Sequence, residues 1–290
     1  MLCMKFDNIF YKSGSADSFI NLKRYEEAIQ TLQAIFLQAD PVNQILTLFD
    51  KIKCLIETNQ TNDALVCGFE ILSLIESNIA TVVFKSSFEQ IETNLESLIE
   101  NFIKIKQDVC IVSMMECWFG LVQNFMKDKP LLTRIVDIGT LIVNQSEILM
   151  SQNKAVDIKE FYLLMDKMYK KMQMTDMDDF KFKSIKVNSF LQRYGMICDY
   201  ARDWYKSVEI HNQAISVLAT ALGAEAEKYQ RFGHCYHNLG VAWKNLDAKD
   251  KAKICYEKSI KVYKKATDYN NVEARKKHLD NTKRNLQLVS

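Results

Sequence analysis

The sequence predicts an all-α protein built from stacked helical hairpins. It contains only 2 prolines and 8 glycines in 290 residues, which leaves few breaks for β-turns and much room for long helices. Large apolar residues recur at helical spacing, whereas the β-branched runs at residues 81–83 and 111–112 are too short and too isolated to form strands. With 48% hydrophobic and 26% charged residues, the chain can bury a sizeable core. We therefore expect helices and essentially no β-sheet.

Two N-terminal segments occupy corresponding places in a repeat. Residues 22–32 have the pattern of a junction followed by the second helix of a hairpin, and residues 61–68 lie 36 residues later in the same place. Between them, residues 45–56 place Leu48, Ile52 and Leu55 on one helical face. This spacing predicts a pair of N-terminal hairpins.

Helical periodicity continues through the middle of the chain, from about residue 84 to residue 174. Helices are expected near residues 130–151, with Gly139 as a contact glycine, and near residues 155–173. This region either continues the stack as degenerate hairpins or forms a separate helical bundle. Residues 172–179 are the most polar and least periodic break, and are the candidate for a joint.

Two C-terminal segments carry the clearest repeat. Large residues and one glycine recur on one helical face, and small and aromatic residues recur on the next helix: Tyr236, Leu239, Gly240 and Trp243, then Ala252, Tyr256 and Ser259. The preceding segment repeats these intervals with Leu191, Tyr194, Gly195 and Cys198, then Ser207, His211 and Ala214. The two glycines are 45 residues apart, and the extra length falls at residues 220–229, where a prolonged helix and an added turn are expected.

The window 236–259 resembles the tetratricopeptide repeat, whose signature places an aromatic, a leucine–glycine pair, a second aromatic and a small residue at about these intervals. The resemblance implies a right-handed α-solenoid of helical hairpins, a tetratricopeptide-like superhelix. The final segment, residues 272–288, has a charged outer face suited to a C-terminal capping helix. We expect degenerate hairpins at residues 1–80 and 81–176, and repeats plus the cap at residues 177–290.

The resemblance also implies a concave peptide-binding groove lined by the first helix of each hairpin. Its positions fall on Ser189, Gln192, Arg193, Met196, Asp199 and Tyr200 in one unit, and on His234, His237, Asn238, Val241, Lys244 and Asn245 in the next. Asn238 is the foremost candidate, because a carboxamide can satisfy a main-chain donor and acceptor together. A solvent-facing asparagine is the alternative.

Scaffolds of this kind that grip the carboxylate of chaperone tails use a lysine three residues before the contact glycine and an asparagine directly after it. Gln192 and Met196 hold those places here. The clamp is therefore incomplete, and chaperone-tail binding is not expected.

No sequence motif indicates an active site. The glycine-rich phosphate-binding, zinc-protease and nucleophile-elbow motifs are missing from the sequence, and only 4 histidines are available as general bases. His234 and His237 lie three residues apart, but no further ligand has zinc-site spacing, so we expect no metal and no cofactor. The three tryptophans and most methionines of residues 114–177 are expected to fill the core, with an adaptable methionine-rich binding surface as the alternative.

These observations favour a non-enzymatic scaffold or adaptor for a protein or peptide partner. The alternatives are a regulatory or ligand-sensing repeat array that acts with a separate output protein, and an enzyme whose site lies in the middle region. A net charge of +2 indicates no nucleic-acid partner, although Lys264, Lys265 and the basic residues of 275–284 form either an acidic-ligand surface or a solvated face. No segment is apolar enough for a membrane. The 8 cysteines lack a disulfide framework and suit the cytoplasm; the sequence leaves the oligomeric state open.

Overall fold

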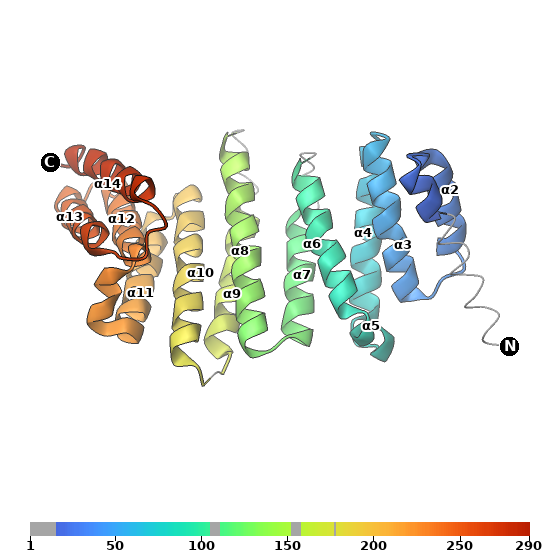
Figure 1. The fold of residues 1–290 in the computed structure, drawn as a ribbon, viewed down its shortest axis with the longest axis horizontal. Coiled ribbons are helices and arrows are strands. Elements are labelled where there is room, and N and C mark those ends of the chain that lie inside the picture. Colours follow the sequence, from blue (N-terminus) through green and yellow to red (C-terminus); the bar gives the residue numbers. More distant parts are fainter. Residues whose placement is uncertain (1–15, 105–110, 152–157, 177) are drawn as a thin grey trace. The chain divides into compact units, whose positions relative to one another are not determined.

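The chain is all-α, as the sequence predicts (Figure 1). In a computed structural model, the described residues are 16–104, 111–151, 158–176 and 178–290, and within these ranges no strand occurs. The protein divides into two compact units, Met1–Phe125 and Met126–Ser290. The candidate joint at residues 172–179 falls within the range of the second unit. The division into three parts at residues 80 and 176 stays a prediction.

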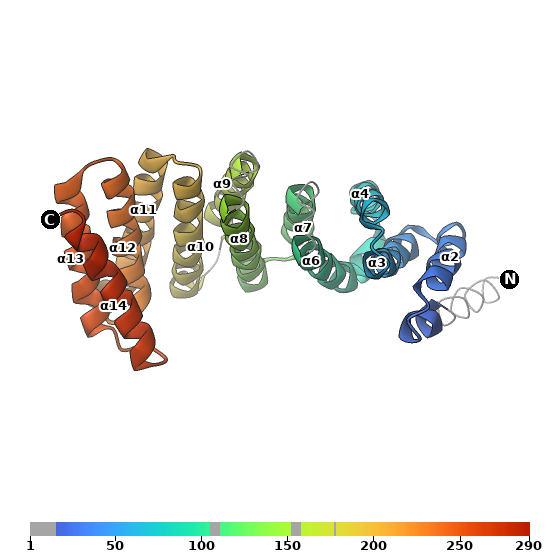
Figure 2. The ribbon, with the colours of Figure 1, turned by 90° about the horizontal axis from the view of Figure 1, so that it is seen from above.

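The first unit is a stack of helical hairpins. A short helix at residues 16–21 precedes the others, which are α2 (Tyr25–Phe36), α3 (Pro41–Glu57), α4 (Thr61–Asn78), α5 (Val82–Ser86), α6 (Phe88–Lys104) and α7 (Ile111–Phe125). Helix α3 packs against α6, and α4 packs against α7 (Figure 2). Asp40 caps α3 by accepting hydrogen bonds from the N–H groups of Val42 and Asn43. Pro41, the first residue of the helix, has no backbone N–H that would need an acceptor.

The second unit consists of three hairpins and a final helix. Its elements are α8 (Asp128–Ser151), α9 (Ile158–Met174), α10 (Phe180–Tyr200), α11 (Trp204–Leu222), the 3-10 helix η3 (Gly223–Lys228), α12 (Gln230–Asn245), α13 (Lys249–Lys265) and α14 (Val272–Gln287). Helix α10 packs against α8, α9, α11 and α12, and α14 packs against α13. The extra length predicted at residues 220–229 is the 3-10 helix rather than a longer α11.

Four hairpins share one tight turn. Lys23, Asn59, Arg202 and Asp247 adopt left-handed backbone conformations with φ of 58°, 59°, 58° and 56°, and a new helix begins two residues after each. The next N–H bonds back five residues, as from Arg24 to the carbonyl of Phe19 and from Ala248 to that of Trp243. This pattern closes the first helix with a Schellman-type cap.

The shared turn sets the second helices in register. The fourth residue of the second helix has a small, fully buried side chain in all four hairpins, namely Ala28, Ala64, Ser207 and Ala252. The two N-terminal repeats and the two C-terminal repeats predicted from the sequence are therefore confirmed.

The contact glycines are also where the pattern predicts them. A β-carbon at Gly240 would lie 2.6 Å from the ring of Tyr256, and one at Gly195 would lie 2.2 Å from the imidazole of His211. At Gly139 the distance to the ring of Phe190 would be 3.3 Å. Close approach of one helix to the next therefore depends on these positions lacking a side chain.

Candidate functional site

A pocket of about 330 Å³ opens between α10, the start of α11, and α12. Half of the twelve predicted groove residues line it: Met196, Asp199, Tyr200, Asn238, Val241 and Asn245. The two first helices, α10 and α12, contribute three residues each. Because both run in the same direction in consecutive repeats, equivalent turns of the two helices face the same opening.

Asn238 is the one predicted residue at this pocket whose carboxamide is uncommitted. It is half-buried, and within the described ranges its side chain forms no hydrogen bond. The neighbouring Asn245 donates its Nδ2–H to the carbonyl of Val241 at 2.9 Å, so that donor is already used. Asn238 can therefore offer a donor and an acceptor to a ligand.

Asp199 and Tyr200 are held in place by neighbouring helices. Ser207 donates its hydroxyl to Asp199 Oδ1 at 2.5 Å, and the buried His211 places Nε2 at 3.8 Å from Asp199 Oδ2. Tyr200 donates its hydroxyl to Glu147 of α8 at 2.9 Å. Burial, with a smaller effect from the hydrogen bond to Glu147, raises the pKa of the Tyr200 phenol. Both residues thus shape a wall of fixed geometry.

Two arginines lie on α10 and α12, further toward the N-terminal ends of these helices. Arg193 donates Nε–H to Thr140 Oγ1 at 2.7 Å and an Nη1–H to the carbonyl of Ser189 at 2.8 Å, while Arg231 donates to Ser189 Oγ at 3.3 Å. Neither guanidinium forms an ion pair with a carboxylate in the part of the chain that the structure describes. Burial lowers the pKa of Arg193; the charge of Asp137 opposes this shift and that of Arg231 adds to it. The pair presents positive charge without a bonded counter-ion.

The remaining predicted groove residues serve other contacts or lie outside the pocket. Gln192 donates to Asn188, which is fully buried and bridges to α11 through the carbonyl of Ala214. Lys244 is half-buried in the last turn of α12 and is not among the lining residues.

The two predicted groove histidines lie against the final helix. His234 Nε2 is 3.2 Å from His278 Nδ1, and His237 Nδ1 is 2.8 Å from Thr282 Oγ1. Burial lowers the pKa of both His234 and His237 to about 4, and the nearby His278 adds to both shifts. Helix α14 therefore covers these two side chains, because they project from α12 toward the next position in the stack.

Sequence reasoning missed two residues of the pocket, Arg202 and Trp204, which come from the turn between α10 and α11. The predicted positions lie only on first helices, whereas the shared turn brings its left-handed residue and the first residue of the second helix to the same opening. The signal that would have found them is the alignment of this turn with residues 247–249.

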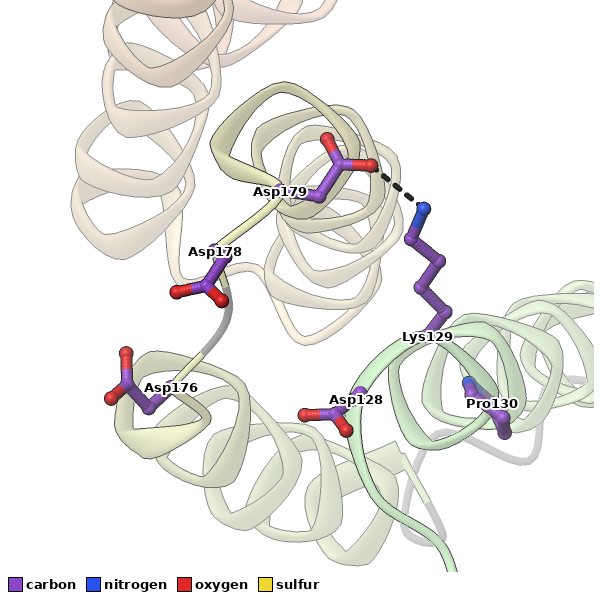
Figure 3. A pocket seen from close by; sticks show the side chains of 6 residues that line it. All are labelled: Asp128, Lys129, Pro130, Asp176, Asp178 and Asp179. Atoms are coloured by element: carbon purple, nitrogen blue, oxygen red, sulfur yellow. Dashed lines mark ion pairs between the residues drawn. The ribbon is translucent and has the colours of Figure 1, made fainter.

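A second opening of about 600 Å³ in this unit is acidic. Asp128, Asp176, Asp178 and Asp179 line it together with Lys129 and Pro130 (Figure 3). Asp179 caps α10 and pairs with Lys129 at 2.7 Å; the Lys129 contact is the main cause that lowers the pKa of this carboxyl. Over the described ranges, no three histidine, cysteine or acidic side chains are arranged to hold a metal ion.

The tryptophans divide between core and surface. Trp118 is fully buried and donates its indole N–H to Glu92 at 2.7 Å, and Trp243 is half-buried with the Lys251 ammonium 4.2 Å from its ring centroid. Trp204 is half-buried and lines the pocket, so it does not fill the core as expected, and its role there stays a prediction.

Most described methionines of residues 114–177 fill the core, as expected. Met114, Met115, Met165, Met168 and Met172 are fully buried. Met174 is 81% exposed, and residue 177 lies outside the described residues. In the described part of the chain, no helix is both long and apolar enough to cross a bilayer.

Comparison with known proteins identifies the C-terminal repeat. Residues 233–271 match the family described as "Tetratricopeptide repeat". No curated protein matches the chain. Among solved structures, BtubC (BKLC) from P. vanneervenii aligns over 87% of this chain and 83% of its own, with 16% identity and a TM-score of 0.47.

Two further structures are similar at lower scores. A putative kinesin light chain of Podospora anserina with nearly identical TPR-like repeats covers 79% of this chain and 99% of its own, at 11% identity and a TM-score of 0.43. The TPR2AB domain of yeast Sti1 in complex with an HSP90 peptide covers 96% and 99%, at 10% identity and a TM-score of 0.34. At these values, nothing about a ligand follows from the three structures.

Proposed function

We propose that this chain, which contains a tetratricopeptide repeat at residues 233–271, is a non-enzymatic scaffold that binds an extended segment of a partner protein between α10 and α12. The uncommitted carboxamide of Asn238 at the wall of a pocket is the observation that carries the proposal. An extended peptide exposes main-chain donors and acceptors, and a carboxamide satisfies one of each without reading the side chains.

The pocket supplies the second part of recognition. Met196 and Val241 give it apolar walls, and Trp204 adds an aromatic surface. One apolar side chain of the bound segment is expected to enter here, because burial of apolar area and one or two anchors dominate the affinity of such interfaces. Hydrogen bonds to Ser207 and Glu147 hold the side chains of Asp199 and Tyr200 in place before the ligand binds, which limits the entropy cost of binding.

Arg193 and Arg231 favour an acidic residue next to the anchor. A partly buried guanidinium without a paired carboxylate is costly, and a carboxylate from the ligand would reduce that cost. We therefore expect a segment with one apolar anchor and a neighbouring aspartate or glutamate. The described free cysteines at 54, 67, 117, 198, 235 and 255 support a reducing compartment such as the cytoplasm for this interaction.

The experiment is selection of peptides from a random display library on the full chain, followed by fluorescence anisotropy with the enriched peptide. Asn238→Ala should weaken binding about tenfold, because two hydrogen bonds at a partly desolvated site are lost. Asn212→Ala is the matched control, since Asn212 is exposed on α11 and bonds only within its own helix. Equal affinities of the wild type and Asn238→Ala would remove Asn238 from the site.

A further inference from the structure

Charge is divided unevenly between the two units. Residues 1–125 contain 9 basic and 16 acidic residues, a net charge of −7, whereas residues 126–290 contain 29 basic and 20 acidic residues, a net charge of +9. The whole-chain value of +2 conceals this division. The first unit therefore attracts cationic partners and repels polyanions.

An apolar groove of about 370 Å³ lies between α4 and α7 of this acidic unit. Leu72 and Ile75 of α4 and Ile79, which follows its last residue, supply apolar lining, and the exposed Glu76 and Glu116 supply acidic lining from the two helices. Within the described residues, no lysine or arginine lines the groove. Figure 2 shows α4 and α7 as neighbouring second helices of consecutive hairpins.

The groove is open because no neighbouring side chain occupies the space beside Gly120. A β-carbon at Gly120 of α7 would meet no atom within 4 Å, whereas the rings of His211, Tyr256 and Tyr263 occupy the space beside the glycines of α10 and α12. Cys117 also lines the groove; burial, and to a lesser extent the charge of Glu76, raises the pKa of its thiol to about 12. The site is therefore partly desolvated and carries a negative field.

We propose that this groove is a second interaction surface, which binds a basic amphipathic helix of a partner protein. An apolar side chain of that helix would sit over Gly120, and a lysine or arginine side chain would pair with the exposed Glu76. A groove between two helices suits the ridge of a third helix, and the charges on its walls select the sign of the flanking residues. This surface belongs to the other unit from the Asn238 pocket, so each proposal can fail without the other.

The test uses the full chain and a fluorescein-labelled amphipathic helical peptide made only of leucine and lysine. The reference peptide has every lysine replaced by glutamate. Gly120→Leu fills the groove and should not lower the melting midpoint, because leucine is a better helix former than glycine and open space is available. Glu76→Lys reverses the charge at the groove, and Glu89→Lys is the control for the same change in net charge on the exposed side of α6.

Anisotropy should show binding of the lysine peptide and none of the glutamate peptide. Filling the groove or reversing its charge should each weaken binding at least about tenfold, while the α6 control should change it less than about threefold. Hydrogen exchange should slow in residues 61–78 and 111–125. Unchanged binding by both groove variants, or protection elsewhere, would overturn the proposal. Self-association of the chain that Gly120→Leu abolishes would assign the groove to a second copy instead.

Discussion

At Gly240 the ring of Tyr256 occupies the space of a side chain, and at Gly195 the imidazole of His211 does the same. Gly120 is the opposite case, since no neighbour lies within 4 Å of a β-carbon there. Glycines in equally helical backbone therefore differ in their effect on packing: Gly195 and Gly240 allow a ring to approach, and Gly120 does not. The helix propensity of glycine alone does not reveal this difference.

Alanine substitution separates these two cases. Gly240→Ala should lower the free energy of unfolding by about 1–3 kcal/mol, because the new methyl group overlaps the buried Tyr256 ring. Gly120→Ala should leave it unchanged or raise it by up to ~1 kcal/mol, because only backbone entropy changes. Urea unfolding followed by circular dichroism measures both. Equal effects of the two substitutions would show that close helix approach at Gly240 has no energetic role.

The pocket residues on first helices could be predicted because their positions follow from the distance to a contact glycine. Met196 and Asn238 lie one residue after Gly195 and two before Gly240, and the structure brings both to one pocket. Arg202 and Trp204 could not be found this way, because their placement depends on a left-handed turn that a non-glycine residue makes. Whether these residues bind a ligand stays a prediction.

Among the elements, helix bounds were the most predictable feature. The expected final helix at residues 272–288 is α14 (Val272–Gln287), and the helix expected at residues 130–151 is α8 (Asp128–Ser151). Hydrophobic spacing specifies such elements because each buries one face against its neighbour. Sequence spacing did not show that α14 would cover His234 and His237, since that depends on where the last helix crosses the stack.

The contact between α12 and α14 should be sensitive to acid. Three of the 4 histidines lie there, and Lys244, Lys277 and Arg231 add positive charge around them. His237 donates Nδ1–H to Thr282 Oγ1, because the Thr282 hydroxyl donates to the carbonyl of His278; a second proton on Nε2 would face the amide donor of Asn285. The interface thus requires neutral imidazoles.

Burial lowers the pKa values of His234 and His237 to about 4 in the folded protein, from the value of 6.5 that an exposed histidine has and that applies to the unfolded chain. Between these values the unfolded chain binds protons that the folded chain does not, so stability is complete above pH 6.5 and falls as the pH drops toward 4. The loss should be on the order of 2 kcal/mol per histidine near pH 5. Melting midpoints across this window measure it.

The control for this titration is the double variant His234→Gln, His237→Gln, which keeps polar side chains that do not titrate. Its midpoint should depend less on pH between 4.5 and 7 than that of the wild type, an interval chosen to span most of the expected shift. A pH dependence equal to that of the wild type would show that carboxylates elsewhere, and not this interface, govern acid stability.

At the scale of the whole chain, composition is informative only after the units are known. The boundary between Phe125 and Met126 is followed by charged residues at 127–129 and by Pro130, but a similar break at Asp40 and Pro41 lies inside the first unit, so the sequence alone does not single out this boundary. The division of charge into −7 and +9 therefore appears only once the structure has placed that boundary. Two units of opposite charge would let one scaffold hold two chemically different partners.

If a partner lies in the pocket between α10 and α12, as we propose, photo-crosslinking from that pocket will capture it. A benzophenone amino acid is placed at Val241, which lines the pocket, or at Ser216, which is exposed on α11, and the full chain is irradiated with the selected peptide. We expect a crosslinked product from Val241, its loss when Asn238→Ala is added, and none from Ser216. Equal crosslinking at both positions, or none at Val241 under conditions where the peptide is bound, would contradict it.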